Sequence, residues 1–138
     1  MIFEHVRPFF ESNFDAVVTT LRKKGATQAS VVKAGAYEDG VVFVAIGSSA
    51  KLKNLARDPR CTVLTVSPDW GRWCVVEGTV TIRDWDNTDH EELRLELREA
   101  FKACGGAHDN WDEYDRVMRE DRRAIVVVKP YHVYGQRV

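Results

Sequence analysis

Short segments rich in β-branched residues recur along the chain, and each is stopped by glycine, proline or a polar turn. This pattern is typical of β-strands, because branched side chains pack well on a pleated sheet. It predicts strands over residues 14–21, 29–37, 41–46, 61–66, 73–82 and 124–134. Gly78 and Pro130 each mark a bulge or an irregular point in a strand. Several short strands with few helices favour a small barrel and disfavour a parallel α/β sheet.

Four other segments carry helix signals. Apolar residues at helical spacing over 2–10 predict an N-terminal helix that covers one end of the barrel, with Pro8 inside it. A second helix is expected over 51–57, where Pro59 prevents its continuation. A third is expected over 93–104 and a fourth over 111–118, because apolar residues recur there on one helical face.

Length and charge exclude several classes of protein. A chain of 138 residues with 44% hydrophobic residues can build one core, so we expect a single domain over residues 1–138. The 20 basic and 21 acidic side chains nearly cancel and form no basic block. This balance argues against binding to nucleic acid and against binding to an anionic membrane.

The cysteines and the N-terminus indicate the compartment. Cys61, Cys74 and Cys104 are odd in number and widely spaced, which argues against a disulfide framework and against a zinc site. No metal site is therefore expected. The N-terminus lacks a signal-peptide pattern, and no apolar run approaches the roughly 18 residues that span a bilayer. We expect a cytoplasmic protein that is neither exported nor embedded in a membrane.

The segment Gly47–Leu55 carries the clearest chemical signal. Ser48 and Ser49 precede a predicted helix, whose first turn offers free backbone N–H groups and the positive end of the helix dipole. Lys51 and Lys53 lie in that turn, where a cation opposes the dipole by roughly 0.3–1 kcal/mol. A bound phosphate would resolve this conflict. The alternative is that the serines only cap the helix and that both lysines are solvated.

The same segment and the residues after it resemble a family signature. Residues 50–60, Ala-Lys-Leu-Lys-Asn-Leu-Ala-Arg-Asp-Pro-Arg, are similar to the Ala-Lys-x-x-Asn-Leu-x-x-Asp-Pro-Arg pattern of the flavin/deazaflavin oxidoreductases. These are relatives of pyridoxamine 5'-phosphate oxidase. Further similar motifs follow in order at residues 76–79, 108–114, 121–123 and 132–135. The resemblance covers nearly the whole chain, and it is closer to the branch that uses coenzyme F420 than to the FMN branch.

The resemblance implies a mainly β fold, a six-stranded split β-barrel of the FMN-binding type with a few helices. It implies a homodimer that holds coenzyme F420 in a groove lined by both subunits. The activity it implies is hydride transfer between the reduced deazaflavin and a small conjugated organic acceptor. The alternatives are an FMN-dependent oxidase or reductase of the same superfamily, and a flavin- or haem-binding carrier without turnover.

Candidate site residues are carried over by motif position. The resemblance implies that the cofactor phosphate is held by Ser48, Ser49, Ala50 and Lys51, with Lys53 and Asn54 supporting the same helix turn. The strand that contains Gln28 and Ser30 would run beside the tricyclic ring, with Gln28 at the ring's polar edge and with Val31 and Val32 flanking it. One departure from the family pattern is Ser49, where relatives often have arginine.

Aromatic and ionisable residues outside this segment give weaker signals. Trp70 and Trp73 surround a turn, and they would either stack on a ring held by the other subunit or serve as dimer contacts; we include Trp73 in the site. His108 and Asp112 have i,i+4 spacing but lack a third metal ligand. The alternating charges of residues 113–123 are typical of a solvated helix face with ion pairs along it. The sequence identifies no catalytic side chain.

Overall fold

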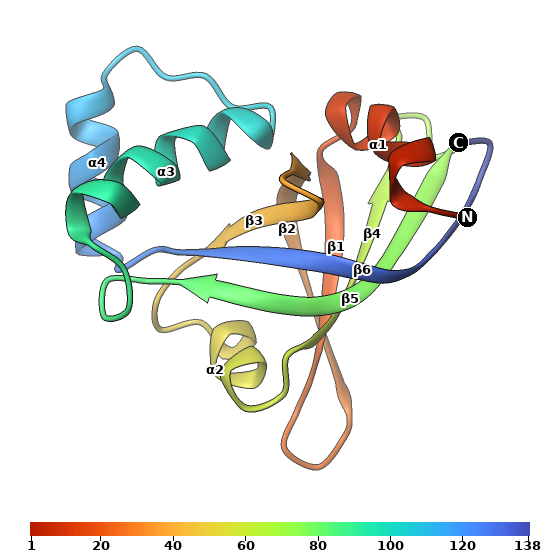
Figure 1. Cartoon of the computed structure of the whole chain (residues 1–138), viewed down its shortest axis with the longest axis horizontal. Helices are drawn as coiled ribbons and strands as arrows, with labels where there is room; N and C mark the ends of the chain where they lie inside the picture. Colours follow the sequence, from red (N-terminus) through yellow and green to blue (C-terminus); the bar gives the residue numbers. More distant parts are fainter.

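The computed structural model describes residues 1–138. Six antiparallel strands close into a barrel in the order β1-β2-β3-β6-β5-β4, and β4 pairs with β1 to complete it (Figure 1). The strands are β1 (Asp15–Leu21), β2 (Thr27–Tyr37), β3 (Gly40–Ala45), β4 (Arg60–Val66), β5 (Trp73–Arg83) and β6 (Ala124–Gln136). The six-stranded barrel predicted from the sequence is confirmed.

Four helices accompany the barrel, namely α1 (Phe3–Ser12), α2 (Ala50–Arg57), α3 (His90–Ala103) and α4 (Trp111–Glu120). α1 continues through Pro8 and buries four apolar side chains in the barrel core, Phe3, Val6, Phe9 and Phe10. α3 and α4 are inserted between β5 and β6 and lie together beside the barrel (Figure 1). None of the four helices is long and apolar enough to cross a membrane.

The position of β3 explains why residues 41–46 form an uninterrupted apolar run. Val41 and Phe43 belong to the core inside the barrel, whereas Val42 belongs to a second core cluster that also contains residues of α3 and α4. All three side chains are fully buried. A strand covered on both faces lacks the alternation of apolar and polar residues that marks a half-exposed strand.

Gly78 and Pro130 meet at the irregular point of the long β5–β6 ladder. The register shifts between Glu77 and Gly78, so that Tyr131 has no partner on β5. A Cβ atom at Gly78 would lie 2.2 Å from the carbonyl oxygen of Lys129, so this close backbone approach requires glycine. The two sequence signals, one on each strand, therefore mark the same bulge.

Two elements begin two or three residues earlier than the sequence pattern indicates. β2 begins at Thr27 because its first residues pair with the end of β1. α3 begins at His90 because the Asp89 carboxylate caps it and accepts the Glu92 N–H at 3.0 Å. Both extensions consist of polar residues, for which apolar periodicity gives no signal.

Candidate functional site

A cavity of about 560 Å³ lies between the β2–β3 part of the barrel, the start of α2 and the inserted helices. We call it the main cavity. Ten of its 15 lining residues are hydrophobic, which makes it apolar over most of its surface. The lining residues are Val31, Val32, Lys33, Val44, Ala45, Ile46, Lys51, Phe101, Cys104, His108, Glu113, Tyr114, Val117, Met118 and Arg123. Three of the predicted site residues, Val31, Val32 and Lys51, are therefore brought together here.

Two of the cations that line the main cavity, Lys51 and Arg123, form what we call the cation pole. Lys51 comes from the first turn of α2, and Arg123 directly precedes β6. Burial and, secondarily, the charge of Arg123 lower the pKa of Lys51 below its ordinary value, and no carboxylate counteracts this shift. Arg123 is partly neutralised by the Asp121 carboxylate, which accepts a hydrogen bond from Nη2 at 3.1 Å. The cation pole thus carries positive charge that the protein does not fully compensate.

Gly47 allows α2 to begin close to Arg123. Its N–H donates to the carbonyl oxygen of Asp121 at 3.1 Å. A Cβ atom at this position would lie 2.6 Å from the Arg122 carbonyl oxygen and 2.9 Å from the Arg122 Cβ. Because these neighbours include backbone, a side chain here would push the loop before α2 away from the chain before β6. Glycine at this position therefore fixes the spacing of the cation pole.

The start of α2 differs from a simply capped helix. Ser49 occupies the N-cap position, but its hydroxyl makes no capping bond, is buried and has no hydrogen-bond partner. The first N–H groups of the helix also lack intrahelical partners. A rotation of Ser49 about χ1 toward these groups breaks no existing bond of the hydroxyl. Ser48 and Ala50 are exposed beside it. This set of donors, next to the cation pole, fits a phosphate group.

Gln28 and Asn54 bond to each other. The buried Asn54 side chain donates from Nδ2 to Oε1 of Gln28 at 2.9 Å and to Oγ1 of Thr20 at 3.0 Å. Arg57 of the same helix donates to the carbonyl oxygen of Leu21. These bonds attach α2 to the β1–β2 pair, so Asn54 helps to fix the position of the helix on the barrel. A contact between Gln28 and the cofactor ring stays a prediction. The side-chain oxygen of Gln28 already accepts the hydrogen bond from Asn54.

The outer face of β2 borders the main cavity. Val31 is 81% exposed, although its side chain is apolar, and Val32 beside it is half-buried. Ser30 is half-buried on the same strand and is not among the lining residues. The exposed Val31 marks the open side of the cavity.

Trp73 and Lys53 lie outside the main cavity of one subunit. Trp73 begins β5, opposite Gln136 of β6, and packs edge-on against Tyr134 with the ring centroids 6.1 Å apart. Lys53 is exposed on α2. Contacts of these two residues with a cofactor therefore stay predictions.

The wall formed by α3, α4 and the loop between them was not assigned to the site from the sequence. It contributes His108, and the chain after α4 contributes Arg123. The residues of motifs 108–114 and 121–123 had been noted only as family similarities or as a charged helix face. Those two motifs were the signal that could have identified this wall, because the fold brings both to the main cavity.

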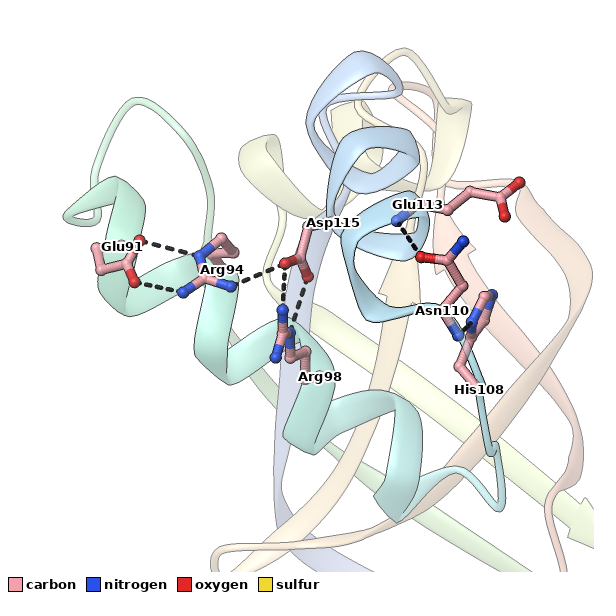
Figure 2. A network of polar contacts seen from close by, with 7 residues as sticks. All are labelled: Glu91, Arg94, Arg98, His108, Asn110, Glu113 and Asp115. Carbon is pink, nitrogen blue, oxygen red and sulfur yellow. Dashed lines mark hydrogen bonds and ion pairs between the residues drawn. The ribbon is translucent and has the colours of Figure 1, made fainter.

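An ion-pair cluster holds α3 against α4 (Figure 2). The Asp115 carboxylate accepts from Nη1 of Arg94 at 2.8 Å and from Nε of Arg98 at 2.9 Å. Hydrogen bonds from Arg98, and then from Arg94, hold the pKa of Asp115 below its ordinary value against the opposing effect of burial. The ion pairs expected along residues 113–123 are present, but the Asp115 side chain is 12% exposed and bridges two helices, so it does not belong to a solvated face.

Comparison with known proteins identifies the family. The model of the pyridoxamine 5'-phosphate oxidase family matches residues 2–137. An F420 reductase of known structure has a TM-score of 0.70 and 17% identity, with 93% of this chain and 94% of the other covered. A conserved hypothetical protein from Mycobacterium tuberculosis has a TM-score of 0.72 and 18% identity, with 98% and 84% covered. General Stress Protein 26 from Bacillus anthracis has a TM-score of 0.63 and 13% identity, with 98% and 94% covered.

At these identities the solved structures share the fold with this chain, whereas the family match extends over nearly its whole length. The barrel topology, the phosphate-compatible start of α2 and the order of the sequence motifs agree with that match. The chain belongs to the pyridoxamine 5'-phosphate oxidase family, whose split barrels bind flavins such as FMN and include oxidoreductases.

Proposed function

We propose that this protein is an F420-dependent oxidoreductase that transfers hydride between the reduced deazaflavin and a small conjugated organic acceptor. The observation that carries the proposal is the main cavity, an apolar groove with the cation pole at one end. An F420 reductase among the structures that share this fold supports the choice of cofactor. The order of the sequence motifs supports it as well.

The cation pole supports phosphate binding for an electrostatic reason. Lys51 and Arg123 repel each other, and burial disfavours the charged form of Lys51 further. A phosphate between them removes the repulsion and accepts charge-assisted hydrogen bonds from both. The first N–H groups of α2 and the hydroxyl of Ser49 add donors on the same side. Lys51, Arg123 and Ser49 would thus hold the phosphate of the cofactor.

The apolar part of the cavity supports binding of a planar ring. Val31 and Ile46 line the cavity and are 81% and 42% exposed, so both leave apolar surface in contact with water. Neighbouring exposed apolar residues of this kind mark ligand sites and protein interfaces. We propose that the ring and a second copy of the chain cover them together, in a homodimer whose interface includes Trp73.

The cofactor supplies the hydride chemistry when it is bound, and the chain supplies its position and surroundings. The cation pole would bind the phosphate, and the exposed Val31 together with the part of Val32 that lines the cavity would contact the ring. Phe101 and Met118 on the opposite wall exclude water from the space above the ring. The Cys104 thiol in this wall is not a nucleophile, because burial raises its pKa to about 12.

Titration of the purified protein with coenzyme F420 and, separately, with FMN tests the proposal, with binding followed by fluorescence. We expect the deazaflavin to bind more tightly. Lys51→Ala is expected to weaken binding about 10- to 100-fold, the value of a hydrogen bond between charged groups. Lys24→Ala removes an exposed lysine in the β1–β2 turn and serves as the control for loss of charge. Equal affinity of wild type and Lys51→Ala would contradict the phosphate assignment.

The FMN-dependent alternative is favoured by the family itself, whose barrels bind FMN. Tighter binding of FMN than of coenzyme F420 would assign the protein to that group. Steady-state oxidation of the reduced cofactor in the presence of conjugated acceptors separates an enzyme from a carrier. A protein that binds the cofactor without turning over with any acceptor would be a carrier.

A further inference from the structure

His108 occupies a defined position in the wall of the main cavity, in the loop between α3 and α4. Its side chain is 29% exposed. The imidazole packs among aromatic rings, with centroids 6.3 Å from Phe101, 5.9 Å from Trp111 and 5.8 Å from Tyr114. Three neighbouring rings restrict the orientations that the imidazole can adopt.

One hydrogen bond assigns the tautomer of this ring. The backbone N–H of Asn110 donates to Nδ1 of His108 at 3.0 Å (Figure 2). Nδ1 is therefore an acceptor, and the proton of the neutral imidazole lies on Nε2. The Asn110 side chain in turn accepts the N–H of Glu113 at 3.1 Å and caps α4. The turn that orients His108 is thus fixed by the same residue that begins the helix.

The other polar side chains of this wall have no free hydrogen-bond donor. The hydroxyl of Tyr114 donates to the carbonyl oxygen of Leu97 at 2.8 Å, and the thiol of Cys104 donates to the carbonyl oxygen of Val42 at 3.5 Å. The Glu113 carboxylate can only accept when it is ionised. The Nε2–H of His108 remains as the donor of this wall that no protein group engages.

We propose that His108 donates a hydrogen bond from Nε2 to a carbonyl oxygen on the ring of the ligand whose phosphate lies at the cation pole. This inference rests on the proposed function and deepens it. His108 precedes α4 and Arg123 follows it, so the donor and Arg123 lie beyond opposite ends of a helix of 10 residues that rises about 15 Å. The groove therefore selects an anion with an apolar planar body and an acceptor oxygen at its far end. A donor at that end would hold the ring carbonyl oxygen and thereby orient the ring within the groove.

Two substitutions separate this role from a structural one. In His108→Gln the amide nitrogen stands in for Nε2, so the donor is kept and the acceptor for Asn110 is lost. In His108→Asn the amide oxygen stands in for Nδ1, so the acceptor is kept and the donor is lost. With coenzyme F420 and FMN as probes, we expect His108→Asn to weaken binding up to about tenfold and His108→Gln to stay within about twofold of wild type.

The thermal midpoints should follow the opposite order, with His108→Gln below His108→Asn, because only the glutamine variant loses the bond to Asn110. Two-dimensional 1H–15N spectra of the imidazole should show the Nε2-protonated tautomer in the free protein and a shift of Nε2 when either probe binds. An Nδ1-protonated ring, or wild-type affinity in His108→Asn, would overturn the inference. If Lys51→Ala still loses affinity in that case, the proposed function stands. Failure of wild type to bind either probe would overturn both.

Discussion

Replacement of Gly47 by alanine is expected to disturb the cation pole and to destabilise the fold. The added Cβ would lie 2.6 Å from the carbonyl oxygen of Arg122, a backbone atom that cannot turn away as the tip of a side chain can. Gly47 does not have a positive φ angle, so lack of space is the reason for the expected effect. The loop before α2 and the chain before β6 must then separate.

The magnitude follows from the packing. Forcing an extra methyl group against a well-packed neighbour costs about 1–3 kcal/mol of the free energy of unfolding. For a chain of this length, each kcal/mol lowers the thermal midpoint by about 3–5 °C, which gives a fall of roughly 3–15 °C. Separation of Lys51 from Arg123 should also weaken phosphate binding by about tenfold, because the bridging hydrogen bonds lose their geometry.

Thermal unfolding and titration with the cofactor measure the two effects on the same protein. Gly71→Ala is the matched control, since a Cβ atom there would lie 3.4 Å from the Asp69 Oδ1, an ordinary contact with a flexible side chain. We expect the control to behave like wild type in both assays. If Gly47→Ala melts at the wild-type temperature and binds the cofactor with wild-type affinity, the argument that Gly47 sets the spacing of the cation pole is refuted.

Three further predictions concern ionisable groups. Binding of a phosphate ligand should weaken as pH rises. Because the pKa of Lys51 is lowered, Lys51 loses its charge at a lower pH than an ordinary lysine, and the decline in affinity should begin below pH 10.5. Titrations with the ligand between about pH 7 and pH 10 measure this decline. In the same range the contribution of Lys51 to the stability of the ligand-free protein should become more favourable as pH rises, since Lys51 binds more protons in the unfolded chain, whereas the raised pKa values of the buried thiols of Cys61, Cys74 and Cys104 act in the opposite direction. Asp115→Asn should cost about 1–3 kcal/mol at pH 7, measured by urea unfolding, through loss of the bonds from Arg94 and Arg98. This difference from wild type should shrink as pH falls below the ordinary value of 3.8, because the stabilisation from a lowered carboxyl pKa is complete above that value and lost below it. Cys104 should resist thiol-directed labelling in the native protein at pH 8 and react after unfolding, and mass spectrometry that finds label on native Cys104 would contradict its burial.

Much of the barrel could be predicted from the sequence, because its signals are local. β-branched runs, the turn residues between them and the paired interruptions at Gly78 and Pro130 each depend on a few neighbouring residues. The pairing order of the strands could not be derived in this way. It depends on contacts between distant segments, such as β1 with β4, and only the family resemblance implies it.

The site was predictable on one side only. A lysine in the first turn of a helix conflicts with the helix dipole, and this local conflict drew attention to Lys51, which lines the main cavity. The approach of Arg123 depends on the pairing of β3 with β6, which no local pattern reveals. The unpartnered hydroxyl of Ser49 and the tautomer of His108 depend on hydrogen bonds that exist only in the folded chain.

The insertion of α3 and α4 into the β5–β6 hairpin has a consequence for divergence. Arg83 at the end of β5 pairs with Ile125 of β6, so the chain leaves the barrel and returns to it at neighbouring points. The segment between β5 and β6 can therefore be replaced as a whole without changing any strand pairing, provided that its replacement still covers Val42 on the outer face of β3. The start of α2, where we propose that the phosphate binds, lies on a different part of the chain. Recombination within residues 84–120 can therefore change one wall of the main cavity, while Lys51 and Arg123 of the cation pole are retained.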